Sequence, residues 1–203
     1  MAGRRYSKKE PPENGSTKER IEEKAVALFS DRGYDATSMR EIAEAAGVTK
    51  PVIYYYFKNK EQLCHHVICS GLEEFRRNLQ RVCNVQSSDI LKQIIRMVQI
   101  HFDFCQKHIE LMRFIYAVNF GPDRKKIDYD FYAYSMEIFQ MQRAIMHKAV
   151  EAGLLQAGKE EDAVYYLRGI ISTFTMLHID GRQRLRPHLA EMIVHDLLNG
   201  IGK

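Results

Sequence analysis

Apolar residues recur at helical spacing along the chain from Ser16 onward. Ile21, Ala25 and Phe29 follow one another at intervals of four, which places them on one face of a helix. No full window of the sequence shows the strict alternation of apolar and polar residues that predicts a β-strand, and no segment repeats at a fixed period. The hydrophobic pattern therefore predicts an all-α chain.

Capping residues divide the N-terminal part of the chain into short helices. Ser16 and Ser38 each precede a glutamate by three residues, which is the pattern of a capping box at a helix N-terminus. Gly33 and Gly47 are placed to end the helices that begin there, because the residue after a helix often has a left-handed backbone. The helix between Ser38 and Gly47 therefore has only about two turns.

A third short helix follows Gly47 directly. Thr49 can cap it, and Pro51 is acceptable in its first turn, where amide groups have no partner within the helix. Two short helices joined by a tight turn with glycine form the signature of a helix-turn-helix, whose second helix enters the DNA major groove. The segment from Ser38 to Lys60 is therefore predicted to bind DNA.

The remainder of the chain also has a helical pattern. Its predicted helices span 60–82, 88–106, 108–118, 124–152, 160–180 and 186–200. The predicted domains are a flexible basic arm at 1–15, a helix-turn-helix DNA-binding domain at 16–60 and a helical domain at 61–203. The arm is either a solvated tail or a segment that follows a DNA groove. The predicted fold class is all-α, with a three-helix N-terminal domain followed by a larger helical bundle.

Composition and charge restrict the class of protein further. Hydrophobic residues make up 45% of the 203 residues, which is typical of a folded globular chain. The sequence has no apolar run of membrane-spanning length, no secretory leader and no CxxC pair among its four cysteines, so we expect a cytoplasmic protein. The net charge of +4 names no partner, but residues 48–60 carry three lysines and no acid, which suits a DNA backbone.

The sequence offers no convincing catalytic or metal site. Residues 153–160 resemble a phosphate-binding loop, but Glu160 replaces the Ser or Thr that would hold magnesium, and a helix precedes the segment instead of a strand. His65 and Cys69 can share a helix face, but two ligands are too few for a zinc site. The sequence contains no serine elbow and no HExxH motif. We therefore expect no enzyme activity, no metal and no cofactor.

Three ordered segments of the sequence resemble one known family. They read FSDRGYDATS at 29–38, IAEAAGVT at 42–49 and IYYYFKNKEQL at 53–63. Together they are similar to the tetracycline-repressor (TetR) family of bacterial regulators. The resemblance implies a homodimer in which each subunit has three DNA-binding helices and a larger C-terminal domain for an effector. The sequence departs from the common family pattern at Pro51-Val52, where members often carry a small residue followed by Thr or Ser.

Helix-turn-helix geometry and the family resemblance together select the candidate DNA contacts. These are Ser38, Thr49, Lys50, Pro51, Tyr54, Tyr55 and Lys60. The first residues of the third helix are expected nearest the bases, and Lys50 can donate to guanine O6 or N7. The resemblance implies phosphate contacts for Ser38, Tyr54 and Lys60. Alternatively, Tyr54 is a core aromatic and Lys60 a solvated lysine, while Ser38 caps its helix in either case.

Residues 100–141 are rich in aromatic side chains and methionine. A plain bundle core explains most of them taken singly, but the resemblance implies that this region encloses an effector cavity. Such a cavity would suit a small apolar or aromatic molecule that a few polar groups orient. The candidate effector contacts are His101, Phe104, Phe114, Asn119, Tyr132, Phe139, His147 and Thr173.

The last two predicted helices are expected to form the dimer. Each carries a broad apolar face near the end of the chain, and two such helices from each subunit would pack as a four-helix bundle. The alternative is that these faces are covered within their own subunit. The candidate interface residues are Leu167, Ile171, Phe174, Leu189, Ile193 and Leu197.

Two functions remain open from the sequence. The first is a repressor that a small effector releases from a palindromic operator. The second is a DNA-binding regulator whose C-terminal domain serves only dimerisation or protein partners. A mostly apolar cavity in the second bundle would favour the first function, and a solidly packed bundle would favour the second. The resemblance implies that the effector tilts the helix that begins near Asn59 and changes the separation of the two recognition helices.

Overall fold

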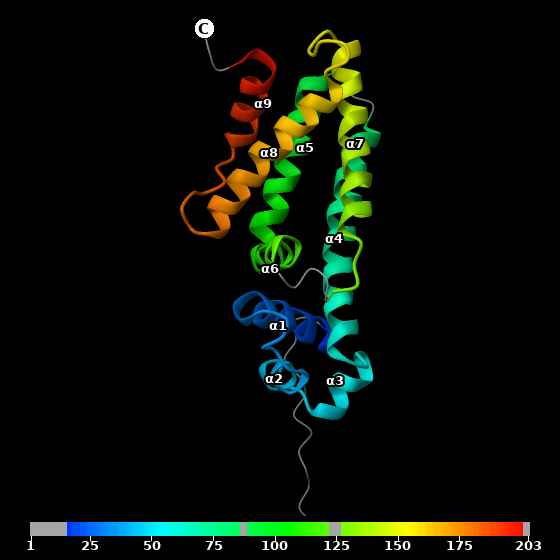
Figure 1. Cartoon of the computed structure of the whole chain (residues 1–203), viewed down its shortest axis with the longest axis vertical. Coiled ribbons are helices and arrows are strands. Elements are labelled where there is room, and N and C mark those ends of the chain that lie inside the picture. The colour runs from blue at the N-terminus through cyan, green and yellow to red at the C-terminus, as the bar shows by residue number, and fades with distance from the viewer. Residues whose placement is uncertain (1–15, 86–88, 122–126, 201–203) are drawn as a thin grey trace, which may run out of the picture.

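The computed structural model describes residues 16–85, 89–121 and 127–200, and the regular elements in these ranges are all α-helices (Figure 1). They are α1 (Thr17–Arg32), α2 (Met39–Ala45), α3 (Lys50–Tyr56), α4 (Lys60–Asn84), α5 (Ile90–Lys107), α6 (Ile109–Phe120), α7 (Phe131–Glu151), α8 (Glu160–Ile179) and α9 (Leu189–Asn199). This confirms the all-α class. None of these helices is long and apolar enough to cross a membrane. The predicted arm at 1–15 lies outside the described residues.

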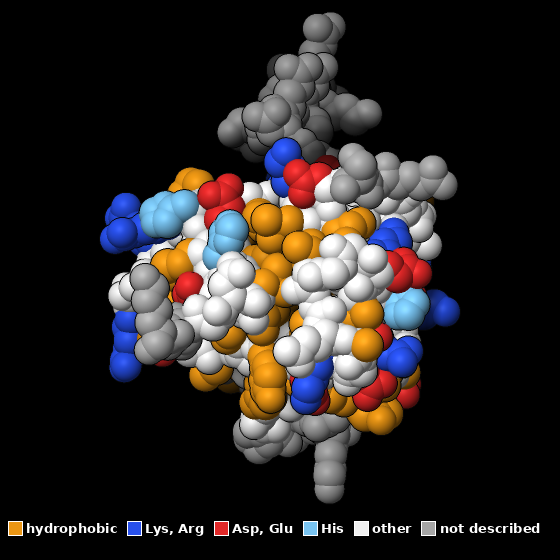
Figure 2. All heavy atoms as spheres, turned by 90° about the horizontal axis from the view of Figure 1, so that it is seen from above, with side chains coloured by type: hydrophobic (Ala, Val, Ile, Leu, Met, Phe, Trp, Pro, Cys, Tyr) orange, Lys and Arg blue, Asp and Glu red, His pale blue; other side chains and the backbone are white. Residues whose placement is uncertain are grey.

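The helices form two groups, one above the other in Figure 1. Helices α1 to α3 form a small cluster at one end of the molecule, and α5 to α9 form a larger bundle at the other. Helix α4 begins beside α3 and continues along the bundle, where it packs against α5 and α7. Because α4 also packs against α1, it belongs to both groups. The bundle end, seen in Figure 2, shows hydrophobic side chains between charged ones at the margins.

A continuous core joins the two groups of helices. Phe29 of α1 is 1% exposed and stacks on Phe114 of α6, with ring centroids 5.2 Å apart. Such an aromatic pair contributes about 0.5–1.5 kcal/mol beyond the burial of its area. Helix α1 is therefore held against α6 as well as α4, and a shift of either helix would be passed on to it.

Local sequence signals set several helix starts. Ser16 and Ser38 both form the predicted capping boxes, in which the serine hydroxyl accepts from the N–H of a glutamate whose carboxylate accepts from the serine N–H. Asn59 caps α4, since its Oδ1 accepts from the N–H of Gln62 at 2.7 Å. Caps of this kind stabilise a helix by about 1 kcal/mol each.

The helix predicted at 124–152 is wrong at its start. Helix α7 begins at Phe131, because the Asp130 side chain caps it by accepting from the N–H of Ala133 at 2.9 Å. The other predicted helices beyond residue 60 agree with the structure to within about three residues at each end.

Candidate nucleic-acid interface and effector cavity

A tight turn positions α3 against α2. Gly47 has a left-handed backbone with φ of 64°, a conformation in which a side chain would be strained. The N–H of Val48 donates to the carbonyl of Ala43 at 2.9 Å and closes the turn. Ile53 and Phe57 are only 0% and 2% exposed, and their burial decides which face of α3 is turned outward.

The outer face of α3 carries the predicted base-contacting residues. Thr49, Lys50 and Pro51 are exposed at its N-terminus, and Tyr55 is 83% exposed one turn further on. Thr49 is the N-cap residue, but its side chain makes no capping hydrogen bond, so the helix does not use its hydroxyl. Tyr54 is 43% exposed, and Nζ of Lys50 lies 5.9 Å from the centroid of its ring. This face therefore offers hydroxyl groups and a cation, and the helix contains no acid.

Ser38 is exposed at the N-terminus of α2, where it caps the helix. Its hydroxyl donates to Oε2 of Glu41 at 2.6 Å and lies 3.3 Å from the Glu41 N–H, from which it accepts. The hydrogen bonds from Ser38 lower the pKa of Glu41, so this carboxylate stays ionised. A phosphate here would gain from the free N–H groups of the helix N-terminus and would also approach the charge of Glu41.

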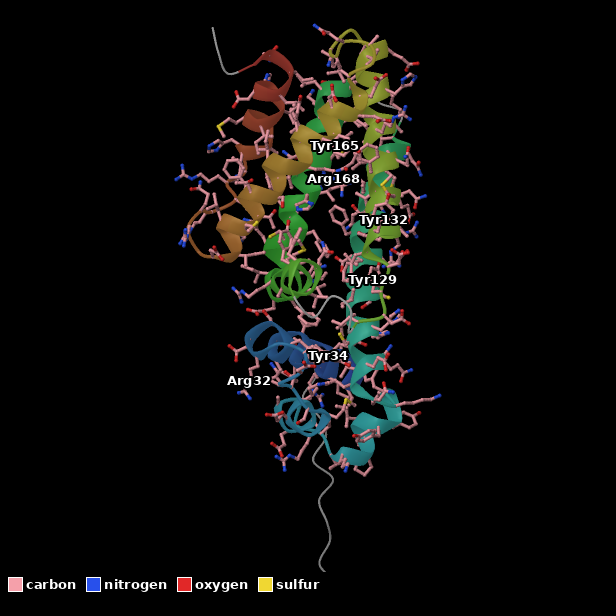
Figure 3. The ribbon with its side chains drawn as sticks, in the orientation of Figure 1. Arg32, Tyr34, Tyr129, Tyr132, Tyr165 and Arg168 are labelled. Atoms are coloured by element: carbon pink, nitrogen blue, oxygen red, sulfur yellow. The ribbon has the colours of Figure 1, made fainter. Side chains whose placement is uncertain are left out.

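Lys60 is engaged within the protein. Its Nζ donates to the carbonyl of Tyr34 at 2.7 Å and lies 4.3 Å from the centroid of the Tyr34 ring. Tyr34 lies between α1 and α4 in Figure 3, so this lysine joins the start of α4 to the turn before α2. The predicted phosphate contact would have to compete with this bond. Nothing in the local sequence pointed to it, because the two residues are 26 positions apart.

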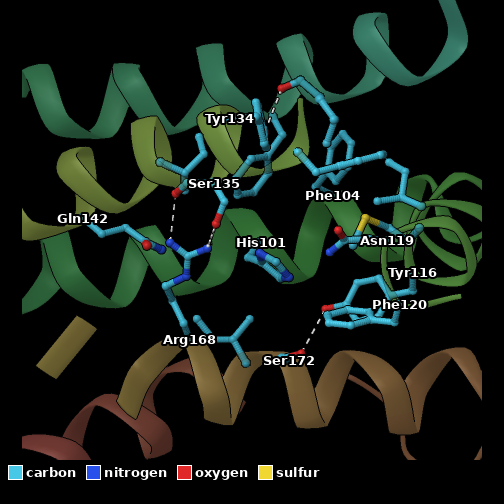
Figure 4. A pocket seen from close by; sticks show the side chains of 17 residues that line it. His101, Phe104, Tyr116, Asn119, Phe120, Tyr134, Ser135, Gln142, Arg168 and Ser172 are labelled. Atoms are coloured by element: carbon cyan, nitrogen blue, oxygen red, sulfur yellow. Dashed lines mark hydrogen bonds between the residues drawn. The ribbon is translucent and has the colours of Figure 1, made fainter. Parts of the chain in front are cut away.

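A cavity of about 270 Å³ lies in the bundle between α4, α5, α6, α7 and α8 (Figure 4). Its wall is mainly apolar and includes Phe75, Phe104, Ile115 and Ile138. Phe120 also lines the cavity and is 75% exposed, which places one end of the cavity at the protein surface. A partly open apolar cavity of this size suits a small ligand.

Polar groups lie at the two ends of the cavity. Arg168, Ser135 and Gln142 lie together at one end in Figure 4, and Tyr116 and Asn119 lie at the other. Arg168 donates to the Ser135 carbonyl at 3.1 Å and to the Ser135 hydroxyl at 2.6 Å. Burial lowers the pKa of Arg168, but a guanidinium remains charged in proteins. The sequence pattern does not single out Arg168, because arginines are mostly found on solvated faces.

His101 lies between the two polar ends (Figure 4). Its Nε2 is buried and has no hydrogen-bond partner among the described residues. Its ring packs edge-on against the Phe75 ring, with ring centroids 5.4 Å apart. Burial, and secondarily the charge of Arg168, lower the pKa of His101 to about 4, so the imidazole is neutral at pH 7. Oε1 of Gln142 is buried without a partner as well. Unpartnered polar atoms in a cavity wall are typical of a site where a ligand or water completes the hydrogen bonds.

The cysteine and histidine cluster on α4 has a different character. Among the described residues, no group of three or more His, Cys, Asp or Glu side chains could hold a metal ion. Burial raises the pKa of Cys64 to about 12, which keeps this thiol protonated. Sγ of Cys69 lies 3.5 Å from the His65 ring nitrogens, and burial raises the pKa of that thiol too. Neither cysteine has the lowered pKa that a reactive thiol needs.

Comparison with known proteins connects this geometry to a family. Residues 21–67, which include α2, α3 and the turn between them, match the model of the family described as bacterial regulatory proteins, tetR family. Residues 21–67 are thus a helix-turn-helix segment of the TetR family. This TetR-family match covers both helices of the helix-turn-helix and the residues that bury the inner face of α3.

Two relatives with curated names are similar over half of this chain or less. "Probable HTH-type transcriptional regulator YttP" of Bacillus subtilis is 35% identical over 102 residues, which is 50% of this chain and 49% of that protein. "HTH-type transcriptional repressor KstR2" of Mycolicibacterium smegmatis is 30% identical over 82 residues, 40% of each chain. The chain thus matches these curated TetR-type relatives over less than half of their length.

Solved structures of the TetR family are similar over nearly the whole chain. The regulator PfmR from Thermus thermophilus has a TM-score of 0.75 and 21% identity, with 94% of this chain and all of that chain covered. A TetR/AcrR-family regulator from Thermobifida fusca has a TM-score of 0.67 and 26% identity, with 92% and 98% covered. These likenesses establish the fold of the larger bundle, which the family model does not reach.

Some of the predicted effector contacts line the cavity. They are His101, Phe104 and Asn119. Two others are buried elsewhere, since Phe114 stacks on Phe29 of α1 and Phe139 packs against Tyr165 with ring centroids 5.0 Å apart. These aromatics share the helical spacing of the cavity wall, and the sequence does not separate core residues from lining residues.

Three further predicted effector contacts lie outside the cavity. Tyr132 on α7 is 68% exposed (Figure 3). His147 is exposed, and its Nδ1 lies 3.4 Å from Oε1 of Glu160. Thr173 is exposed, and its hydroxyl donates to the carbonyl of Gly169 at 2.9 Å. None of the three lines the cavity.

The predicted dimer residues lie mostly inside the subunit. Leu167, Ile171, Leu189 and Ile193 are buried in the core, and Phe174 and Leu197 are half-buried. The apolar face of each helix is used to pack α8 and α9 onto their own bundle. The large apolar side chains exposed on these helices are different ones, namely Tyr165, Tyr166, Met176 and Met192.

Proposed function

We propose that the chain is a homodimeric DNA-binding transcriptional regulator of the cytoplasm, and that a small effector in the cavity releases it from a palindromic operator. The outer face of α3 is the observation that carries this proposal. Lys50, Tyr54 and Tyr55 are exposed on it, the helix contains no acid, and buried Ile53 fixes its orientation. Lysine can read guanine in the major groove, and hydroxyl groups can contact phosphate.

The cavity favours an effector-responsive regulator over one whose C-terminal domain serves only dimerisation or protein partners. Protein interiors normally pack densely, so a bundle used only for association needs no cavity of this size. The cavity is bounded by α4 and α6, and these are the helices against which α1 packs. A ligand that favours one arrangement of α4 and α6 would therefore move α1 to α3. The two recognition helices would then no longer match half-sites about 34–36 Å apart.

Helices α8 and α9 are the proposed dimer interface. Their exposed apolar residues include Tyr166, Met176 and Met192, which are 64%, 53% and 45% exposed. Side chains of this type are enriched in protein interfaces. The side chains of Leu167, Ile171, Leu189 and Ile193, which are buried in the subunit, would pack directly under this surface. Sedimentation of the free chain should give twice the subunit mass, and a monomer at micromolar concentration would contradict the interface.

In vitro selection from a pool of random DNA duplexes tests the DNA-binding function. We expect the selected duplexes to contain an inverted repeat whose half-sites are about one helical turn apart or a multiple of that. The chain should bind the selected duplex about a thousandfold or more tightly than a shuffled duplex of equal length at physiological salt. Equal affinity for both duplexes would contradict a sequence-specific regulator.

A further inference from the structure

Among the described residues that line the cavity, one carries a positive charge and none carries a negative charge. Its lining includes no Asp or Glu, and Arg168 supplies its only fixed charge among the described residues. No carboxylate of the described residues forms an ion pair with this guanidinium, whose partners are the carbonyl and hydroxyl of Ser135. The other groups that act on its charge are the phenols of Tyr165, Tyr116 and Tyr134. A half-buried cation without an anion is costly unless a ligand supplies the anion.

The guanidinium has donors to spare for such a ligand. An arginine has five N–H donors in a planar fork. The two hydrogen bonds to Ser135 fix the orientation of the guanidinium and leave other N–H groups for a ligand. Arg168 reaches across from α8 to Ser135 on α7, so its orientation is fixed before any ligand binds. A fork held in this way is suited to a carboxylate or phosphate group.

The apolar wall and the volume restrict the rest of the ligand. Away from Arg168 the cavity continues past His101 and Phe104 toward Phe120 at the surface. A cavity of about 270 Å³ with this wall suits a small ligand. A ligand that fills it would thus have a short hydrocarbon part and one polar head.

We propose that the effector is a monoanionic carboxylate with an apolar tail, whose head group binds Arg168 and whose tail extends toward Phe120. This inference rests on the proposed function, because it names the ligand of the same cavity. A carboxylate is favoured over a phosphate monoester because one guanidinium balances one negative charge. The second charge of a phosphate would remain unpaired beside the neutral His101 and Gln142.

Binding of matched eight-carbon probes to the full-length protein tests the charge of the ligand. Titration calorimetry would compare octanoate, 1-octanol, octyl phosphate and octylamine at one pH and salt concentration. We expect octanoate to bind about 10- to 100-fold more tightly than octanol, since a charge-assisted hydrogen bond has that effect on affinity. Octanol binding as tightly as octanoate would overturn the proposal, as would tighter binding of octyl phosphate or octylamine, or no binding of octanoate at millimolar concentration.

Variants of Arg168 separate ligand binding from a structural role. R168M should remove the preference for octanoate over octanol, R168K should keep part of it, and the exposed control R77M should keep all of it. If the arginine mainly ties α8 to α7, R168M should instead lower the melting temperature of the ligand-free protein. A ligand-binding role predicts an unchanged or higher melting temperature, because an uncompensated charge is removed. A destabilised R168M together with an unchanged ligand preference in R168K and R168Q would overturn the assignment.

The proposed function can fail independently of this inference. Ligand-free R168M should bind the selected duplex as tightly as the wild-type chain does, and octanoate should release only the wild type. If octanoate binds through Arg168 but no duplex is released, the effector site stands and the regulatory mechanism fails. If the chain binds DNA and octanoate does not bind, the regulator stands and the carboxylate is wrong.

Discussion

The DNA-facing helices and the effector cavity are built in opposite ways. The helix-turn-helix is made mostly of neighbouring residues, and two of its polar side chains are bonded within the protein, Ser38 to Glu41 and Lys60 to Tyr34. The cavity draws its wall from five helices and contains polar atoms without partners, including Nε2 of His101. The fold of the first region is set without a ligand, whereas under the proposed function a ligand would complete the hydrogen bonds of the second. The helix-turn-helix thus presents a preformed surface to DNA, whereas the cavity is the place where a ligand would act on the protein.

The largest expected effect concerns the contact that joins the two regions. We expect Phe29→Ala to lower the free energy of unfolding by about 3–5 kcal/mol, because it leaves a cavity at the stack on Phe114. Urea denaturation at a fixed protein concentration measures this. Phe120→Ala is the matched control, since this aromatic is 75% exposed and should change stability by less than about 1 kcal/mol. A loss in Phe29→Ala no greater than that of the control would mean that the two regions are not joined through α1 and α6.

The same contrast explains what the sequence could predict. The capping boxes at Ser16 and Ser38 were predictable because each signal lies within four residues of chain. The start of α7 was missed because Asp130 caps it without the glutamate three residues on that marks a capping box. Arg168 and the bond from Lys60 to Tyr34 depend on chain segments that meet only after folding. The sequence likewise does not tell whether an apolar residue such as Leu167 or Ile193 is buried within its own subunit or in a dimer interface.

The second prediction divides the outer face of α3 into base reading and phosphate contact. Lys50→Ala should reduce discrimination at one base pair of each half-site by about 1–3 kcal/mol. Tyr54→Phe should weaken binding to every duplex by about 0.5–1.5 kcal/mol, because it removes a hydroxyl hydrogen bond that carries no base information. Fluorescence anisotropy on the selected duplex and on its single-base variants measures both. If the two variants lose affinity equally across all duplexes, the division of roles is wrong.

The smallest expected effect decides what Lys60 does. If its bond to the Tyr34 carbonyl persists on DNA, Lys60→Met should lower the free energy of unfolding by about 0.5–1.5 kcal/mol. The dependence of log affinity on log salt should then stay unchanged. Lys58 is the matched control, because it is exposed in the same acid-free segment. Lys58→Met should leave stability unchanged, and if that lysine lies on a phosphate the salt slope should fall by about 0.9.

The opposite pair of results would mean that Lys60 contacts the DNA backbone. A salt slope reduced by about 0.9 in Lys60→Met, without loss of stability, would mean that the lysine leaves Tyr34 when DNA binds. The bond to Tyr34 would then be a resting position, and the start of α4 would be freed at the moment the protein engages its site. In that case the DNA-facing region would also contain a group that a ligand completes, and its contrast with the cavity would be one of degree.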